Sequence, residues 1–222
     1  MVELTDNNAV SDLVSIPDGT SLLVTGPVLT GKRRLMNSLL AAGDPAARGT
    51  AIVTTRKPGN TVEREFRALA DVPDEQFSVV DCVSRSGGFG LAAATPGRRY
   101  ISDPGDLTGI GIAMTEFMRR FYDRGCDARI GLHTLSTMLM YVDLKRVFQF
   151  LHVVTGRIAT SGFSGVFVLD DNVVSEREET IMLQPFDAVM EVRDEERTEL
   201  RVRGADFGPS RWTPVGFEAV VQ

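Results

Sequence analysis

The sequence contains few of the residues that hold metal ions or form disulfide frameworks. It has two cysteines, Cys82 and Cys126, and two histidines, His133 and His152, among 222 residues. None of the four has a neighbour at the short spacing that zinc sites use, and two distant cysteines do not make a disulfide framework. We therefore expect buried thiols and no structural metal.

Long apolar runs and a signal peptide are also missing. No stretch approaches the roughly 18 apolar residues that suggest a membrane-spanning helix, and the N-terminal MVELTDNNAVSDL is acidic, with no positive region before an apolar core. The composition, 43% hydrophobic and 24% charged, is typical of a soluble globular protein. We expect a cytoplasmic protein with no membrane insertion, folded as a single domain over residues 1–222.

The sequence has fewer positively charged residues than negatively charged ones. The chain has 24 Lys and Arg against 30 Asp and Glu, a net charge of −6. A negative surface repels phosphate backbones, and the basic residues are not interleaved with aromatics that would stack on bases. The composition therefore argues against nucleic-acid binding. A high-salt cytoplasm and an ordinary solvated face both account for the acidic excess, and the sequence does not separate them.

The most informative stretch is the loop TGPVLTGKR at Thr25–Arg33. In a phosphate-binding loop, G-x-x-x-x-G-K-[ST], backbone N–H groups cradle phosphates, the lysine reaches the terminal phosphates, and the last hydroxyl holds magnesium. Gly26, Gly31 and Lys32 match this pattern. Arg33 replaces the hydroxyl, and a guanidinium has only donors, so it cannot ligate a cation. The loop predicts phosphate contacts without ordinary magnesium-dependent hydrolysis.

The flanks of the loop agree with this interpretation. Ser21–Thr25 is apolar and β-prone, and Lys32–Ala42 has apolar residues at helical spacing before Gly43, a natural helix stop. An ordinary βα turn that happens to contain glycines is the alternative. The lysine beside the second glycine favours a phosphate-binding loop.

Strand-like and helical segments alternate along most of the chain, which predicts an α/β fold with a mostly parallel central sheet flanked by helices. We expect strands at Ser21–Thr25, Thr50–Thr55, Gln76–Val83, Arg129–Thr134 and Gly165–Leu169. Helices are expected at Lys32–Ala42, Thr61–Ala70, Thr108–Arg124 and Tyr141–Ile158, with a long loop at Ser84–Asp106. Alternating residues at Ala188–Arg193 and Thr198–Arg203 predict a C-terminal antiparallel β-hairpin extension at the sheet edge.

Four ordered stretches carry a resemblance to a known family. They are the phosphate-binding loop, Asp106-Leu107-Thr108, the LHTLS stretch at Leu132–Ser136, and the LRVRG stretch at Leu200–Gly204. In this order, from about Ser15 to Phe217, the chain resembles a RecA-type ATPase core, and most closely the KaiC-like branch found in archaea and bacteria. The resemblance implies a RecA-like P-loop core and a family in which nucleotide state controls assembly.

The resemblance also places the family's catalytic positions on this sequence, and most of them have changed. Leu29 stands where the family has a small residue, and Arg33 replaces the magnesium-binding hydroxyl. The acidic pair that activates water falls at Arg56-Lys57, and the Walker B aspartate falls at His133. Each such group typically contributes about 10²- to 10⁴-fold. The resemblance therefore implies a degenerate ATPase without catalytic residues, in which hydrolysis is very slow or absent.

The replacements make the predicted site cation-rich at the carboxyl edge of the sheet, where α/β folds bind ligands. Two interpretations remain open. The cations substitute for magnesium and hold ATP, ADP or another phosphate-containing anion, or the pocket is vestigial and its arginines pair with local carboxylates. Residual catalysis is a third interpretation. The candidate binding residues are Gly26, Thr30, Gly31, Lys32, Arg33, Arg56, Lys57, Asp170 and, adding charge when protonated, His133.

Three further features need a structural test. Asp170-Asp171 follows an apolar run as a Walker B acid does, but in the RecA-type order this strand is the fifth, so we expect Asp170 at the pocket edge, paired with Lys32 or Arg33. Arg201 and Arg203 align with a family element that reaches a neighbouring subunit's nucleotide, although a solvated strand face is the simpler explanation. The basic residues Arg85, Arg98 and Arg99 lie in the long loop and indicate either a contact site or a mobile segment.

Together these features predict a regulatory or scaffolding protein that binds a nucleotide or anion without hydrolysing it and acts with a protein partner or with copies of itself. A weak ATPase that regulates signalling or motility is the first alternative. A recombinase-like DNA-binding protein is the second.

Overall fold

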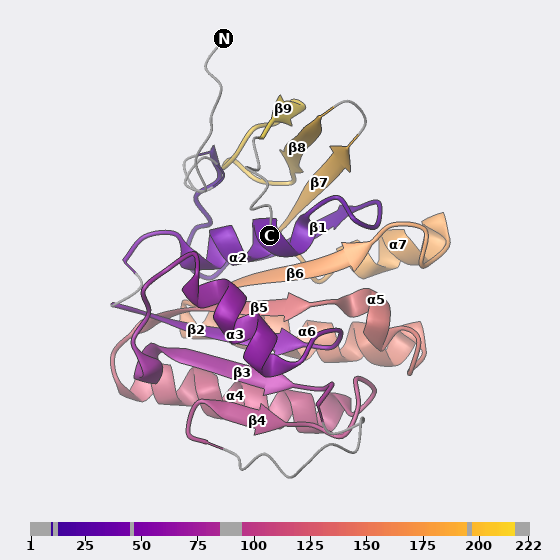
Figure 1. Cartoon of the computed structure of the whole chain (residues 1–222). Helices are drawn as coiled ribbons and strands as arrows, with labels where there is room; N and C mark the ends of the chain where they lie inside the picture. The colour runs from indigo at the N-terminus through magenta and orange to yellow at the C-terminus, as the bar shows by residue number, and fades with distance from the viewer. Residues whose placement is uncertain (1–9, 11–12, 45–46, 85–94, 195–196, 216–222) are drawn as a thin grey trace.

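The computed structural model describes residues 10, 13–44, 47–84, 95–194 and 197–215. Its described part contains a nine-stranded sheet in the order β4-β3-β2-β5-β6-β1-β7-β8-β9 (Figure 1). The strands are β1 Ser21–Gly26, β2 Arg48–Thr54, β3 Phe77–Asp81, β4 Arg98–Tyr100, β5 Asp127–His133, β6 Ser164–Asp170, β7 Ala188–Asp194, β8 Thr198–Arg203 and β9 Thr213–Pro214.

The sheet is parallel from β4 to β7 and antiparallel at its end. β1 pairs in parallel with both β6 and β7, and β5 pairs in parallel with β2 and β6. β8 runs antiparallel to β7 and to β9. The predicted α/β class and the C-terminal antiparallel extension are confirmed. Parallel pairing also brings the residues after β1, β2, β5 and β6 to one edge of the sheet.

Helices cover both faces of the sheet. The helix α2 (Lys32–Ala41) and α3 (Gly59–Arg67) lie on the near face in Figure 1, and α4 (Leu107–Asp123) and α6 (Leu144–Ser161) lie on the far face. Shorter elements are α5 Leu135–Met138, α7 Glu176–Leu183 and the 3₁₀ turn Asp74–Gln76. Because side chains alternate along a strand, Leu22 and Val24 pack with α2 and α3, and Leu23 packs into the opposite cluster.

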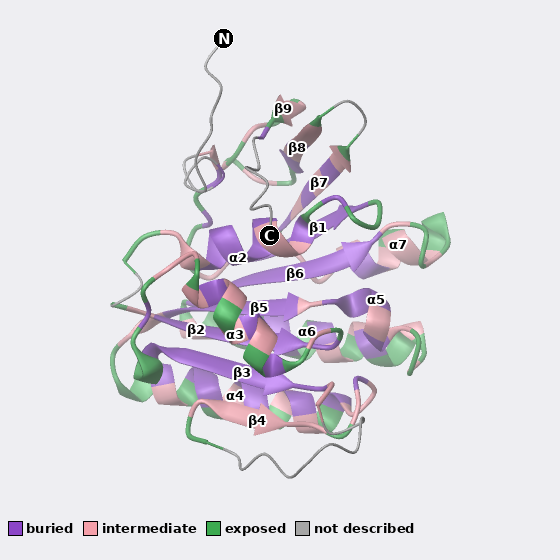
Figure 2. Cartoon of the chain, viewed as in Figure 1, coloured by how far each residue is buried: buried purple, intermediate pink, exposed green. Residues whose placement is uncertain are grey.

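The inner strands β1, β2 and β6 are therefore almost fully buried, with apolar residues on both faces (Figure 2). In the described part of the chain, no helix is long and apolar enough to cross a membrane. The same residues contain no group of three or more His, Cys, Asp or Glu placed to hold a metal ion.

The structure differs from the sequence-based prediction mainly in short elements. The predicted loop at Ser84–Asp106 contains β4, a three-residue edge strand, and the prediction missed α5, α7 and β9. Such short elements bury too few residues to produce a periodic apolar pattern. In α7 the sequence signal was the capping box of Ser175 and Glu178, in which each side chain bonds the other residue's backbone N–H. The helix α6 begins at Leu144, after its cap Asp143, and not at Tyr141.

Substitution of Gly49 tests how tightly α4 packs against β2. A Cβ added to Gly49 would lie 2.5 Å from Cδ1 of Phe121, whose ring is fully buried. We expect Gly49→Ala to lower the free energy of unfolding by about 1–3 kcal/mol because the ring must shift. Gly156 on α6 is the matched control, since a Cβ there meets nothing within 4 Å. Gly156→Ala should raise stability by about 0.5–1 kcal/mol. Urea denaturation measures both, and equal effects of the two substitutions would contradict the packing.

Candidate functional site

The phosphate-binding loop connects β1 to α2 at the carboxyl edge of the sheet. Gly26 has a φ of 152°, and a Cβ there would lie 2.2 Å from the carbonyl oxygen of Val192 on β7. Gly31 caps α2 with a φ of 77°. Leu29 also has a positive φ, 68°, which is strained for a residue with a Cβ. Its side chain is 91% exposed. The side chain of Leu29 therefore lies mostly in solvent at the mouth of the pocket.

A pocket of about 390 Å³ opens beside this loop. All the predicted binding residues except Gly26 line it, and Arg34 joins them. The lining residues are Leu29, Thr30, Gly31, Lys32, Arg33, Arg34, Arg56, Lys57, His133 and Asp170. Five of these side chains are cationic and one is a carboxylate. The predicted cluster is thus brought together, because the ends of β1, β2, β5 and β6 lie side by side.

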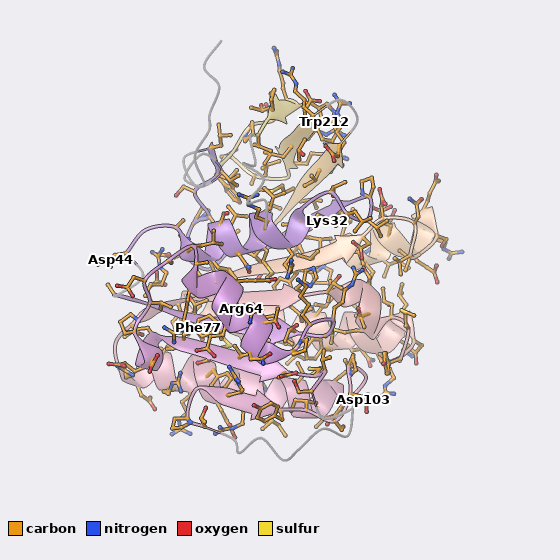
Figure 3. The ribbon with its side chains drawn as sticks, in the orientation of Figure 1. Lys32, Asp44, Arg64, Phe77, Asp103 and Trp212 are labelled. Carbon is orange, nitrogen blue, oxygen red and sulfur yellow. The ribbon has the colours of Figure 1, made fainter. Side chains whose placement is uncertain are left out.

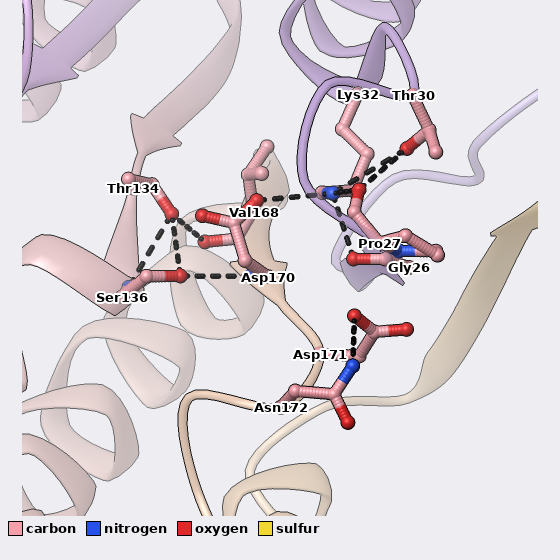
Figure 4. A network of polar contacts seen from close by, with 10 residues as sticks. All are labelled: Gly26, Pro27, Thr30, Lys32, Thr134, Ser136, Val168, Asp170, Asp171 and Asn172. Carbon is pink, nitrogen blue, oxygen red and sulfur yellow. Dashed lines mark hydrogen bonds and ion pairs between the residues drawn. The ribbon is translucent and has the colours of Figure 1, made fainter.

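Lys32 is 4% exposed and is held inside the loop. Its Nζ donates to the carbonyl oxygens of Gly26, at 2.7 Å, and Pro27, and lies 3.4 Å from Oγ1 of Thr30. It also lies 3.0 Å from Oδ1 of Asp170, so the predicted pairing of Asp170 with Lys32 is present (Figure 4). An ammonium has three N–H donors. An incoming anion would therefore have to replace part of this internal set.

A ladder of hydroxyl groups fixes the position of Asp170. Its backbone N–H donates to Oγ of Ser136 at 2.7 Å, and Oγ1 of Thr134 donates to the carbonyl oxygen of Val168 at 2.8 Å (Figure 4). Oγ1 of Thr55 donates in turn to the carbonyl oxygen of Thr134 at 2.9 Å. The ladder ties together the ends of β2, β5 and β6. Thr134 and Ser136 belong to the LHTLS stretch, but the resemblance implies no role for either, and no motif in the sequence marks Thr55.

Glu65 of α3 is a second carboxylate at the rim of the pocket, and it is not among the residues predicted from the sequence. Nη1 of Arg33 pairs with Oε2 of Glu65, and Nζ of Lys57 lies 2.8 Å from Oε1. The charged residues of α3 resemble an ordinary solvated helix face, so no motif marked Glu65. Arg56 is exposed and makes no hydrogen bond or ion pair with any residue that the structure describes.

His133, at the end of β5, does not add positive charge to the pocket. The pKa of its imidazole is lowered from 6.5 to about 4. Burial is the largest cause, the nearby positive charge of Arg33 acts in the same direction, and Asp170 opposes the shift. The imidazole is therefore neutral at pH 7. The expectation that His133 adds charge when protonated does not apply at neutral pH.

Asp171 does not line the pocket. Its Oδ1 accepts a hydrogen bond from Nδ2 of Asn172 at 3.0 Å (Figure 4). The strand β6, which ends at Asp170, lies between β1 and β5 in the sheet. This order matches the assignment in which β5, ending at His133, corresponds to the Walker B strand. In the other assignment the metal-orienting acid is Asp170 or Asp171, and of these two Asp170 is the one that lines the pocket.

Arg201 and Arg203 lie on one face of β8, as expected, but away from the pocket. Both pair with Glu191 on β7, Arg203 at 2.8 Å, and Arg201 also lies 4.5 Å from the ring centroid of Trp212. Trp212 and Lys32 are well separated in Figure 3. The two arginines thus pair within the hairpin, and their contact with a neighbouring subunit stays a prediction.

The predicted basic loop is only partly described. Arg85 lies outside the described residues. Arg98 and Arg99 belong to β4, where Arg98 pairs with Glu63 and Arg99 lies 2.9 Å from Glu116. Both arginines belong to a strand, so their assignment to a loop was wrong, and a contact role for them stays a prediction.

The pKa of His133 predicts a pH dependence of stability. Because the pKa is about 4 in the folded protein and 6.5 is the ordinary value, the unfolded chain binds more protons between these pH values. The free energy of unfolding should fall as the pH is lowered from about 6.5 to about 4, by at most about 1.4 kcal/mol per pH unit. Urea denaturation across this range should show a smaller slope for His133→Gln. His152→Gln, which removes the exposed histidine of α6, should keep it; equal slopes in both variants would contradict the assignment.

Several solved structures have folds similar to that of this chain. A KaiC-like protein of the hyperthermophilic archaeon Pyrococcus horikoshii has a TM-score of 0.58 at 14% identity, covering 92% of this chain and 88% of that chain. The flagellar accessory protein FlaH of Methanocaldococcus jannaschii has a TM-score of 0.57 at 13% identity, with 96% and 97% covered. An uncharacterised Pyrococcus horikoshii protein, solved in complex with an unknown peptide, has a TM-score of 0.64 at 14% identity, with 90% and 94% covered.

These likenesses confirm a RecA-like fold of the KaiC-like kind, and identities this low show the fold alone. No curated protein matches the sequence. A family model described as a family of unknown function (DUF7504) matches residues 19–192, which include the phosphate-binding loop and the strands that surround the pocket. The chain therefore belongs to this family of unknown function, DUF7504.

Proposed function

We propose that the pocket binds a nucleotide or another phosphate-containing anion without magnesium, and that the protein is a regulatory or scaffolding protein that does not hydrolyse its ligand. The observation that carries the proposal is the charge of the pocket. Five cationic side chains and one carboxylate line it, beside a loop of the phosphate-binding type. The concentration is notable in a chain whose net charge is −6.

The chemistry of the pocket supports anion binding without a metal. Magnesium needs oxygen ligands, and a phosphate-binding loop normally supplies a hydroxyl at the position of Arg33. Asp170 is the one carboxylate among the described lining residues, and its Oδ1 already lies 3.0 Å from Nζ of Lys32. A divalent cation would enter a region of like charge, whereas guanidinium and ammonium groups bind phosphate oxygens directly.

The same residues argue against hydrolysis. Water activation needs a general base whose pKa lies near the working pH. Among the titratable lining residues, His133 is the one that is neutral at pH 7, but with a pKa of about 4 it is a weak base. Arg56 and Lys57 stand where the KaiC-like resemblance places the acidic pair. The weak-ATPase alternative is therefore less well supported than non-hydrolysing binding.

The internal ion pairs give some support to a vestigial pocket. Lys32 pairs with Asp170, and Arg33 pairs with Glu65, as that interpretation requires. Two observations favour binding. Arg56 has no partner among the described residues, and the pair of Arg33 and Glu65 is about 30% exposed, where ion pairs are weak and exchange readily. The DNA-binding alternative loses support because Arg98 and Arg99 are paired.

We also propose that the protein acts with a protein partner or with copies of itself. Val28 and Leu29, at the tip of the loop, are 57% and 91% exposed. Apolar side chains beside a charged pocket favour contact with another protein surface. Occupancy of the pocket would then alter the surface that such a partner contacts.

Thermal unfolding with pyrophosphate, ADP and ATP tests the proposal. In EDTA, each ligand should raise the melting temperature, because a ligand that binds the folded state at about 100 times its Kd adds about 2.7 kcal/mol of stability. Arg56→Gln should reduce this rise in melting temperature and leave the melting temperature of the unliganded protein unchanged. Lys145→Gln is the control, because it removes an exposed charge from α6 and changes the net charge by the same amount. Each ligand should raise the melting temperature of this variant as much as that of the wild type.

The outcomes separate the alternatives. No shift with any ligand would support a vestigial pocket. A shift that requires magnesium, together with release of inorganic phosphate from ATP, would support the weak ATPase. Binding of single-stranded DNA that weakens with salt would support the recombinase-like alternative.

A further inference from the structure

Glu65 occupies the position where two cations of the pocket rim converge. Its two carboxylate oxygens are divided between them, Oε2 to Nη1 of Arg33 and Oε1 to Nζ of Lys57. The two cations come from different elements, since Arg33 lies in the first turn of α2 and Lys57 lies between β2 and α3. A carboxylate that bridges two such groups presents its oxygens much as a phosphoryl group would.

We propose that Glu65 is an internal counter-ion that competes with the ligand for Arg33 and Lys57, so that the pocket selects anions with at least two linked phosphoryl groups. The inference rests on the anion-binding function proposed above. It assigns the affinity and the selectivity of that site to a residue of α3 that does not line the pocket itself.

Glu65 is better placed to yield to a ligand than the other carboxylate, Asp170. The Lys32 and Asp170 side chains are 4% and 12% exposed, and the hydroxyl of Ser136 holds the backbone of Asp170. Glu65 and Arg33 are 31% and 29% exposed, so water can solvate both groups as they separate. Breaking a buried ion pair leaves an uncompensated charge away from water, which is costly, whereas the charges of a partly exposed pair are solvated when they separate.

The two carboxylates, Asp170 and Glu65, pair with different cations and so divide the pocket into an inner and an outer part. Lys32, in the inner part, faces the carbonyl oxygens of Gly26 and Pro27 within the loop. Arg33 and Lys57 form the outer part with Glu65. A single phosphoryl group seated in the loop engages the inner part alone. A second, linked group is needed to reach the outer cations and release Glu65.

Glu63 provides a closely matched control for Glu65. Both lie on α3, and both side chains are 31% exposed and pair with two cations. The partners of Glu63 are Arg67 and Arg98, which lie outside the pocket around Lys32. Glu63→Gln and Glu65→Gln therefore remove the same charge from the same helix and differ in which cations they release.

Isothermal titration of wild type, Glu65→Gln and Glu63→Gln with pyrophosphate and with orthophosphate, in EDTA, tests the inference. We expect Glu65→Gln to bind pyrophosphate about two- to fivefold more tightly than wild type, the size of one partly exposed ion pair. Orthophosphate affinity should change little in this variant, and Glu63→Gln should match wild type with both anions.

Wild-type pyrophosphate binding that Glu65→Gln leaves unchanged would overturn the competition and leave the proposed function standing. An equal gain in pyrophosphate affinity in Glu65→Gln and Glu63→Gln would also overturn it, and so would an equal gain for pyrophosphate and orthophosphate in Glu65→Gln. In either case the loss of one negative charge at long range would explain the change in affinity. No pyrophosphate binding by any of the three proteins would overturn both proposals. Binding by Glu65→Gln alone would support the competition and overturn the proposed function of the wild-type pocket.

Discussion

The parallel pairing of β1 with β6, β6 with β5, and β5 with β2 is the constraint on which the pocket depends. Four strands that run in one direction end at one edge, so their following residues meet even though they lie far apart in sequence. The hydroxyl ladder of Thr55, Thr134 and Ser136 then links these ends, from β2 to the backbone of Asp170. Both faces of the sheet are buried under helices, which leaves this edge as the place for polar groups.

The electrostatics of the pocket follow from that convergence. Cations from the loop after β1 and the turn after β2 lie close together, and carboxylates from β6 and α3 partly neutralise them. The like charges also account in part for the low pKa of His133, since a protonated imidazole would face Arg33, Arg56 and Lys32 after paying the cost of burial. The positive charge of the site thus favours anionic ligands and disfavours cations, in contrast to a site built around a divalent metal.

The fold by itself does not specify what the pocket binds. A KaiC-like protein and FlaH have a similar fold at 13–14% identity, so very different sequences form this framework. Function lies in the residues placed on such a framework. Here the residues at the edge are Arg33, Arg56, Lys57 and His133, and the proposed function follows from their chemistry.

The sequence by itself determined the class of fold, the phosphate-binding loop and most of the pocket residues. Apolar periodicity is strong in long buried elements, and motif positions at strand ends map to one edge once the strands are parallel. It did not reveal β4 or α7, whose few residues carry no clear period. Only the tertiary structure decided that Glu65 bridges Arg33 and Lys57, that Glu191 holds Arg201 and Arg203, and that His133 is neutral. Ion pairs and pKa shifts depend on the distance between side chains and on their burial, and neither quantity is encoded in local sequence.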